Sequence, residues 1–187
     1  MRFCFTFRPR FSSAVKAAFL DRDGVINVDY AYVHSRENFH FIPGALEGAA
    51  ELVRKGHQLI IVTNQSGIGR GKYSIDQFRE LTFWLAGVFA RNHAPLSAVY
   101  FCPHHPHKGY EGEISELKID CDCRKPKPGL LLKAAEDFNI DMSQSWMIGD
   151  GENDVKAGEA AGCKSILIDK DIFGKRCLFE CVDEVLS

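Results

Sequence analysis

A strand pattern that ends in two carboxylates constrains the fold of this chain more than any other feature. Residues 15–20 are apolar apart from Lys16, and Asp21 and Asp23 follow them directly, with Gly24 behind. Such an apolar run is typical of a strand buried in a parallel sheet, where ligands bind at the carboxyl ends of the strands. Two acids crowded at that edge repel each other unless they share a cation or a proton. The stretch therefore predicts a magnesium site, with a plain strand-to-loop turn as the alternative.

The composition is that of a globular chain. Its 187 residues are 45% hydrophobic and 26% charged, which predicts a single domain over residues 1–187. The net charge of -2 gives no general attraction to nucleic acid or to an anionic membrane. No apolar run has the length of a membrane span, and residues 1–15 lack the pattern of a secretory signal. We therefore expect a cytoplasmic monomer, and an odd number of cysteines, seven, argues against a disulfide framework.

Helical and strand patterns alternate along the rest of the chain. Helical spacing of apolar residues covers residues 43–56, 74–92, 129–138 and 153–161, and strand-like runs cover residues 57–62, 97–101, 146–150 and 165–168. This order predicts an α/β fold with an open, Rossmann-like parallel sheet and helices on both faces. The segment between Asp23 and the first helix is too short for a cap domain. Residues 1–13 fit either a short edge strand or a loose basic arm.

Polar side chains follow several strands of the predicted sheet. Thr63 and Asn64 follow the second strand, Asp150 follows the fourth, and Lys125 lies in the loop before a helix. A carboxylate nucleophile, a hydroxyl, a cation and a further carboxylate for Mg²⁺ are what phosphoryl transfer requires. Each residue also has an ordinary interpretation: a strand cap for Thr63, a solvated charge for Lys125 and a turn at Asp150.

The long loop after the third strand carries four potential metal ligands in two pairs, each separated by one residue: Cys102 with His104, and Cys121 with Cys123. A Cys₃His set suits tetrahedral Zn²⁺, and four protein ligands leave no open position for catalysis. We therefore expect a structural zinc that braces residues 102–123. The alternatives are free buried thiols beside surface histidines, or His105 or His107 as the ligand in place of His104.

Four motifs occur in an order found in a known family: residues 21–27, 62–67, 124–126 and 148–154. With them the chain resembles the haloacid dehalogenase-like phosphohydrolases over about residues 17–168. The cysteine pattern is similar to that of their zinc-containing branch without a cap domain, which holds the heptose bisphosphate and histidinol-phosphate phosphatases. The resemblance implies hydrolysis of a phosphomonoester through an aspartyl-phosphate. One departure is Gly151, where the heptose phosphatases often have a lysine.

The resemblance also implies a role for each motif residue. The residues that would act on the phosphoryl group are Asp21 as nucleophile, Asp23 as general acid and then base, and Thr63 and Lys125 as contacts to its oxygens. Mg²⁺ would bind Asp21, Asp150 and the backbone carbonyl of Asp23. Three roles stay open for Asp154: it binds the metal through water, orients Lys125, or caps the following helix.

Cations beyond those needed for the reacting phosphate indicate the substrate class. Arg124, with Arg70 or Lys72 as helpers, suggests a second anionic group on the ligand, although Arg70 and Lys72 also fit solvated loop charges. A sugar bisphosphate has such a group, whereas the ammonium of histidinol phosphate is repelled by arginine. The further substrate-binding candidates are Asp29, Tyr32, Asn64, Gln65 and Ser66. We expect a heptose 1,7-bisphosphate cleaved at position 7, of either anomer, with histidinol phosphate as the alternative.

Other classes of protein share some of these features. A phosphorylation-dependent receiver also has an acidic pair and Mg²⁺, but its acceptor aspartate should end a strand later in the chain. A zinc-braced, non-catalytic interaction module would not need the acids, Thr63 and Lys125 together. A sugar-phosphate mutase would usually carry a cap domain.

Overall fold

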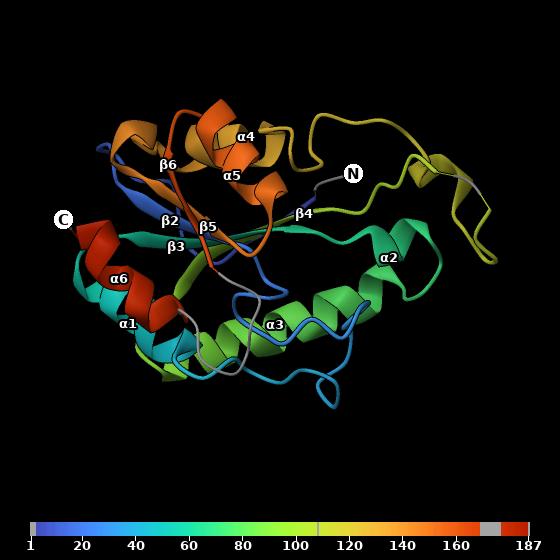
Figure 1. Ribbon diagram of the computed structural model, residues 1–187, viewed down its shortest axis with the longest axis horizontal. Helices are drawn as coiled ribbons and strands as arrows, with labels where there is room; N and C mark the ends of the chain where they lie inside the picture. Colours follow the sequence, from blue (N-terminus) through green and yellow to red (C-terminus); the bar gives the residue numbers. More distant parts are fainter. Residues whose placement is uncertain (1–2, 108, 169–176, 187) are drawn as a thin grey trace.

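The computed structural model describes residues 3–107, 109–168 and 177–186, and six strands within them form one open sheet (Figure 1). In sheet order they are β1 (Cys4–Thr6), β4 (Leu96–Cys102), β3 (Gln58–Asn64), β2 (Ala17–Leu20), β5 (Trp146–Gly149) and β6 (Lys164–Leu167). Strands β2 to β6 are parallel, and β1 is antiparallel to β4. The predicted open α/β sheet is confirmed. For the amino-terminal segment the sequence allowed an edge strand or a loose arm, and residues 4–6 form an edge strand. Residues 1–2 lie outside the described residues.

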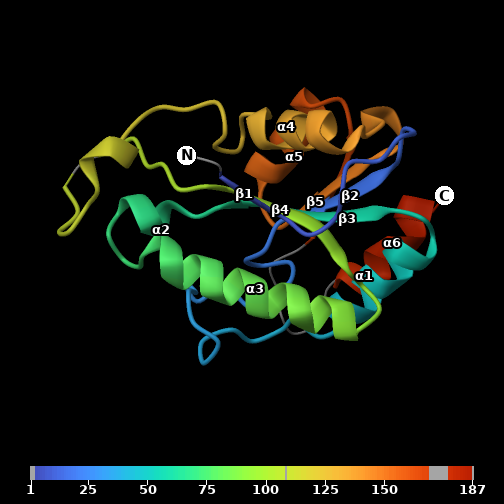
Figure 2. The ribbon, with the colours of Figure 1, turned by 180° about the vertical axis from the view of Figure 1, so that it is seen from behind.

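Helices cover both faces of the sheet, as Figures 1 and 2 show from opposite sides. One face carries α1 (Ala45–Arg54), α3 (Ile75–Arg91) and α6 (Leu178–Leu186), and the other carries α4 (Gly129–Phe138) and α5 (Glu152–Ala160). Ser74 caps α3 as predicted, since its hydroxyl accepts from the N–H of Gln77 and the Gln77 side chain accepts from the N–H of Ser74. The sequence patterns did not predict α6, the short helix α2 (Ser66–Gly69), or the 3₁₀ helices at Ser115–Leu117 and Met142–Gln144.

The central parallel strands bury both of their faces. In β2, Ala18 and Leu20 pack into the core under α1, α3 and α6, while Ala17 and Phe19 pack into the core under α4 and α5. All four side chains are fully buried. A strand buried on both sides needs apolar residues at every position, which explains the continuous apolar run before Asp21.

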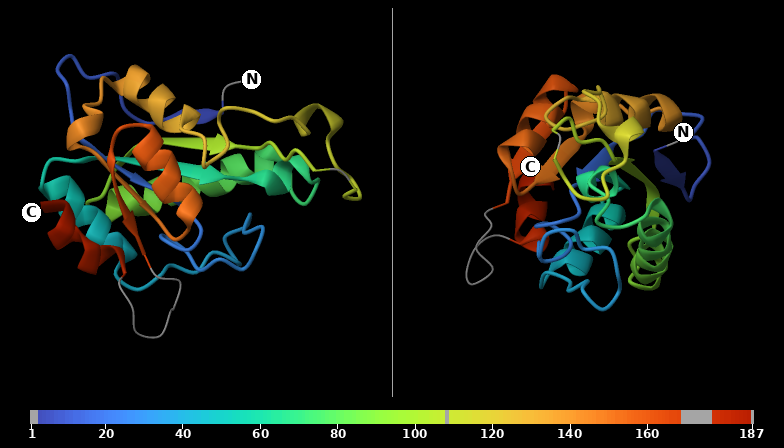
Figure 3. Two further views of the ribbon diagram at one scale, coloured as in Figure 1. Left: turned by 45° about the horizontal axis from the view of Figure 1, so that its top comes forward. Right: turned by 90° about the vertical axis from the view of Figure 1, so that its right-hand side faces the viewer.

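Two long connections leave the edge where the parallel strands end. Residues 21–44 lead from β2 to α1, and residues 103–107 and 109–128 belong to the loop after β4 that extends beyond α2 in Figure 3. This loop is attached to α2, because the N–H of Gly69 donates to the Pro103 carbonyl at 3.1 Å and the N–H of Ile114 donates to the Gly69 carbonyl at 3.0 Å. None of the described helices combines the length and the apolar character needed to cross a membrane.

Candidate active site

A cavity of about 290 Å³ opens where β2, β3 and β5 end. The predicted site residues that line it are Asp21, Asp23, Asp29, Tyr32, Thr63, Asn64, Gln65, Ser66, Arg70 and Asp150. These residues come from segments that are distant in the sequence, and they meet because β2 lies between β3 and β5 in the sheet. The expected clustering at one sheet edge is therefore observed.

A buried ammonium group lies behind this cavity. Lys125 is 2% exposed, and its Nζ lies 3.1 Å from Oδ1 of Asp21 and 2.5 Å from Oδ1 of Asp154. The same Nζ donates to the carbonyl of Val62 at 2.7 Å. The other carboxylate oxygen of Asp154 accepts from the N–H of Gly151 at 3.1 Å, at the start of α5. Asp154 thus makes both the contact with Lys125 and the helix cap that the sequence left as alternatives.

Burial controls the ionisation of Asp21. Removal of its carboxyl group from water raises its pKa to about 7, Lys125 opposes this shift, and Asp154 and Asp23 add to it. For Lys125, burial alone lowers the pKa, but the two neighbouring carboxylates outweigh burial and raise it above its ordinary value. Three carboxylates, those of Asp21, Asp150 and Asp154, thus gather around a single ammonium group.

The excess carboxylate charge fits a divalent cation. Oxygens of Asp21, Asp150 and Asp154 lie within 4.8 Å of one another. Asp150 approaches the turn after β2 because residue 24 is glycine: a Cβ there would lie 2.1 Å from Oδ2 of Asp150, and the φ of Gly24 is +84°. Carboxylate oxygens of this kind suit Mg²⁺. Asp21 and Asp150 line the cavity, whereas Asp154 does not and has one oxygen on Lys125 and the other on the N–H of Gly151, so Asp21 and Asp150 are the side chains that fit the ion best.

The carboxylate of Asp23 is held by donors from three buried side chains. Arg22 donates from Nη2 to Oδ1 at 2.8 Å and from Nε to Oδ2 at 3.1 Å. Asn27 donates to Oδ1 at 2.9 Å, and Gln65 donates to Oδ2 at 3.0 Å. Sequence reasoning gave no role to Arg22 or Asn27. The sequence feature that could have indicated the role of Arg22 is its position between two acids, directly after a strand that is buried on both faces.

The end of β3 lies two residues beyond the predicted strand, at Asn64. Thr63 is 1% exposed, and its hydroxyl accepts from the amide of Gln65 at 2.9 Å. The amide of Asn64 donates to the carbonyl of Lys125 and accepts from its N–H, both at 3.1 Å. Asn64, predicted to bind substrate, therefore also fixes the backbone that presents Lys125.

The three cations predicted to bind a second anionic group, Arg70, Lys72 and Arg124, differ in their access to the cavity. Arg70 lines the cavity and donates from Nη1 to the hydroxyl of Tyr32 at 2.6 Å. Its Nε is buried without a hydrogen-bond partner among the described residues. Arg124 and Lys72 are not among the residues that line the cavity, and Arg124 donates from Nη1 to the backbone carbonyl of His104 at 3.4 Å. Of these three cations, Arg70 therefore has the most direct access to the cavity.

The four predicted zinc ligands converge. The ligand atoms of Cys102, His104, Cys121 and Cys123 all lie within 4.8 Å of one another. The three sulfur atoms are 3.2–3.5 Å apart, and Nδ1 of His104 is 3.2 Å from the Cys123 sulfur. The alternatives lie outside this cluster, since Nδ1 of His105 contacts the backbone of His107 and its Nε2 contacts Arg70. The cluster is thus suited to hold a metal ion with four protein ligands.

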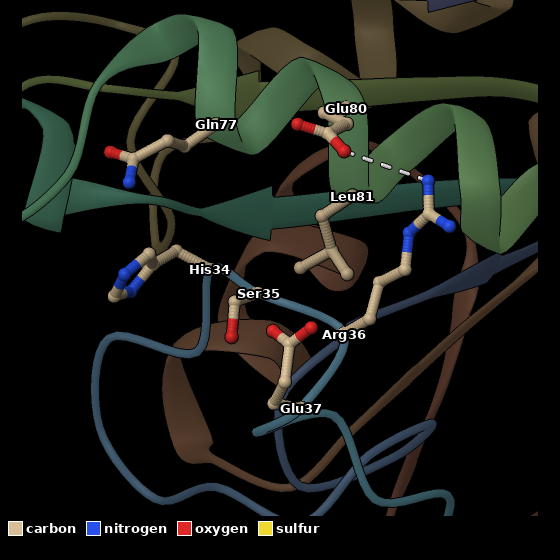
Figure 4. A pocket seen from close by; sticks show the side chains of 7 residues that line it. All are labelled: His34, Ser35, Arg36, Glu37, Gln77, Glu80 and Leu81. Atoms are coloured by element: carbon tan, nitrogen blue, oxygen red, sulfur yellow. Dashed lines mark ion pairs between the residues drawn. The ribbon is translucent and has the colours of Figure 1, made fainter.

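A second hollow of about 280 Å³ lies between residues 34–37 and α3. Figure 4 shows Arg36 reaching across it to Glu80, with 3.6 Å between the charged atoms. Both side chains of this ion pair are largely exposed, and the lining mixes charges of both signs. It contains none of the motif residues, so the first cavity is the candidate active site.

Comparisons with known proteins agree with this geometry. Residues 122–180 match the profile of the HAD-hydrolase-like family. The D-glycero-β-D-manno-heptose-1,7-bisphosphate 7-phosphatase of Vibrio cholerae is 52% identical over 149 residues, which cover 80% of this chain and 78% of that protein. The enzyme of the same name from Escherichia coli K12 is 47% identical over 150 residues, covering 80% and 76%.

A solved structure is also similar: D,D-heptose 1,7-bisphosphate phosphatase from B. bronchiseptica, complexed with magnesium and phosphate. Its TM-score is 0.76 at 28% identity, over 91% of this chain and 98% of that one. The fold and the site thus define a phosphatase of the haloacid dehalogenase-like (HAD-like) class. Within this class, the chain belongs to the D-glycero-β-D-manno-heptose-1,7-bisphosphate 7-phosphatase family. The expected enzyme class is confirmed, and the receiver and the non-catalytic module find no support.

The raised pKa of Asp21 predicts how the stability of the magnesium-free protein depends on pH. The pKa of Asp21 is about 7 in the folded state against an ordinary value of 3.8, so the folded protein binds more protons between these values. The free energy of unfolding therefore falls as pH rises from about 4 to about 7, by up to about 1.4 kcal/mol per pH unit. Asp21→Asn cannot ionise, so it should match the wild type near pH 4 and exceed its stability by roughly 2 kcal/mol at pH 8, after allowance for partial exposure.

Chemical denaturation across this pH range, on protein dialysed free of magnesium, measures the difference. Glu159→Gln, which removes an exposed carboxylate from α5, is the control and should follow the wild-type profile. Parallel profiles for Asp21→Asn and the wild type would show that Asp21 does not titrate in this range.

Proposed function

We propose that this enzyme removes the 7-phosphate from D-glycero-β-D-manno-heptose 1,7-bisphosphate through a phosphoenzyme on Asp21. The observation that carries the substrate class is Arg70, a cation with an unpartnered buried Nε, in the same cavity as Asp21 and Asp23. Such a cation fits the phosphate that does not react. The sequence did not distinguish between the two anomers. The names of the two relatives support the β anomer, and they also support cleavage at position 7.

The reaction uses the two acids in turn. Asp21 attacks the phosphorus, the bond from phosphorus to the sugar oxygen breaks, and Asp23 donates a proton to the departing oxygen. Water then attacks the phosphorus of the phosphoenzyme while Asp23 accepts its proton, so phosphate leaves and the Asp21 carboxylate is restored. The contacts of Arg22, Asn27 and Gln65 support this role, because they hold Asp23 beside the cavity.

Charge on the transferred group is balanced from several sides. The hydroxyl of Thr63 and the ammonium of Lys125 contact the phosphoryl oxygens, where positive charge favours the transition state. Mg²⁺ fits at Asp21 and Asp150, with the backbone carbonyl of Asp23 as a further ligand. When bound, it supplies positive charge to the phosphoryl oxygens and keeps the Asp21 carboxylate ionised.

We assign zinc to the cluster of Cys102, His104, Cys121 and Cys123. Burial lowers the pKa of His104, which favours the neutral imidazole that binds metal. Four protein ligands leave no open position, so the ion is structural. Since Cys123 precedes Arg124 and Lys125, the ion helps to order the backbone that leads to the active site.

The remaining substrate contacts follow from the lining of the cavity. Asp29 and Tyr32 suit the hydroxyl groups and the carbon face of a sugar, and Asn64 and Ser66 add polar contacts. Histidinol phosphate is disfavoured because Arg70 repels its ammonium. Arg124 would need to move to help bind the second phosphate. A single domain over residues 1–187, a cytoplasmic location, a monomeric state and the absence of nucleic-acid or membrane partners stay predictions.

Substitution of Asp21 and substitution of Asp23 should block different steps of the reaction. Asp21→Asn should abolish turnover, and Asp23→Asn should lower kcat on a sugar phosphate by about 10²- to 10⁴-fold because proton transfer is lost. With an aryl phosphate, whose leaving group needs no proton, Asp23→Asn should accumulate phosphoenzyme. Mass spectrometry of acid-quenched protein checks for phosphate on the peptide that contains Asp21. Turnover at the wild-type rate in Asp21→Asn would refute the mechanism.

Zinc should contribute to stability more than to chemistry. Wild-type protein purified without chelator should contain one zinc per chain by elemental analysis. Cys121→Ser should lose zinc and show a lower Tm and lower activity together, because the loop before Lys125 loses its brace. Cys177→Ser, a cysteine outside the cluster, should keep its zinc. Wild-type protein without zinc would remove the assignment.

A phosphate-release panel tests the substrate. The panel compares kcat/KM for both heptose bisphosphate anomers, fructose 1,6-bisphosphate and histidinol phosphate, and the β anomer should give the highest value. Arg70→Met should lower kcat/KM for the bisphosphate by about 10- to 100-fold, as expected for loss of a charged hydrogen bond, but should have little effect on heptose 7-phosphate. Lys72→Met serves as the matched control. A clear preference for histidinol phosphate would overturn the assignment.

A further inference from the structure

The side-chain amide of Gln65 is saturated by protein groups. Its Nε2 donates to Oδ2 of Asp23 at 3.0 Å and to Oγ1 of Thr63 at 2.9 Å, and its Oε1 accepts from the hydroxyl of Tyr73 at 2.5 Å. Gln65 is 2% exposed and Tyr73 is 6% exposed. Both hydrogens of the amide are used, so Gln65, predicted to bind substrate, has no donor left for a ligand in this arrangement.

The hydrogen bond from Tyr73 determines which end of the Gln65 side-chain amide faces Asp23. The oxygen and nitrogen of an amide are similar in size, so hydrogen-bond partners determine its orientation. Burial raises the pKa of Tyr73, so the phenol keeps its proton and donates it to Oε1. The NH₂ group of Gln65 must then face Asp23. The reverse orientation would place Oε1 against a carboxylate oxygen, which is repulsive.

The ring of Tyr73 is fixed from two sides. The ring of His34 stacks on it, with centroids 5.1 Å apart and planes at 8°. On another side lies Gly67, where a Cβ would be 2.2 Å from a ring carbon of Tyr73. Residue 67 therefore has to be glycine for the ring to occupy this place. The hydroxyl of Tyr73 is thus held at Gln65 by its surroundings.

We propose that Tyr73 and Gln65 are positioning residues that hold Asp23 in the orientation needed for proton transfer to the leaving group. Arg22 and Asn27 come from the same turn as Asp23. Gln65 instead follows β3, so its hydrogen bond connects Asp23, which follows β2, to the end of β3 that would contact the phosphoryl group. This fixes the distance between the proton donor and the reacting phosphate, on which the rate depends steeply. The inference rests on the proposed function, because it takes Asp23 as the general acid.

Tyr73→Phe is the sharpest test, because it removes one oxygen and keeps the ring. It should lower kcat/KM for an alkyl phosphate such as the heptose bisphosphate by about three- to tenfold, as expected for one neutral hydrogen bond. The value for p-nitrophenyl phosphate, whose leaving group departs without a proton, should stay close to that of the wild type. Gln65→Met, which keeps the chain length but lacks the amide, should lower the alkyl value by about 10- to 100-fold with the same selectivity.

Tyr100→Phe is the matched control. Its hydroxyl donates to Asp137 at 2.7 Å and its side chain is 1% exposed, but it lies in the core under α4, away from the cavity. It should leave both kcat/KM values unchanged. Circular dichroism of all variants checks that they fold.

An equal loss for the alkyl and aryl phosphates in Tyr73→Phe and Gln65→Met, or no loss for either, would overturn the positioning role. Failure of the proposed substrate is distinguishable, because it shows in the wild type as no turnover of the heptose bisphosphate. The comparison is then made with whichever alkyl phosphate the wild type hydrolyses. Asp23→Asn is the reference: a general acid at this position requires that it also lowers the alkyl value more than the aryl value.

Discussion

The ammonium of Lys125, enclosed among two carboxylates and a carbonyl, is the interaction on which the rest of the site depends. A buried charge is tolerated only when partners replace the water it has lost. Here the partners are Asp21, Asp154 and the Val62 carbonyl, which come from three different segments of the fold. Bringing the β2, β3 and α5 segments together around one cation also brings Asp21, the proposed nucleophile, beside the proposed phosphate site. Folding of the chain therefore also assembles the proposed catalytic groups.

The long loop after β4 carries this cation near its end, and contacts on both sides of Lys125 fix the loop. Asn64 holds the backbone of Lys125 on one side. On the other, α4 begins tightly against the segment that carries the proposed zinc ligands Cys121 and Cys123, since a Cβ at Gly129 would lie 2.3 Å from the carbonyl of Asp122. A long loop usually needs support of its own, and these contacts, together with the proposed zinc, provide it. Only Arg124 separates Cys123, a proposed zinc ligand, from Lys125 in the chain, so the proposed zinc site and the candidate active site share a short stretch of backbone.

The sequence predicted the fold and the strand-end residues because both depend on patterns along the chain. An apolar run that stops at Asp21, Thr63 or Asp150 locates the end of β2, β3 or β5 to within two residues, and parallel strands share one edge. The direction of a side chain within that edge depends on contacts between distant segments, which no local pattern contains. For this reason the clamp of Arg22 on Asp23 and the contact of Tyr73 with Gln65 were not anticipated.

Strand β1 has a consequence for association between molecules. The residues of β4 are buried along its whole length, and its outer backbone edge pairs with Cys4, Phe5 and Thr6. An uncovered apolar edge of that length is a typical template for strand pairing between molecules, whereas a three-residue edge strand offers little to pair with. A short segment that contributes no residue to the cavity therefore shields this edge of the sheet from pairing with another molecule.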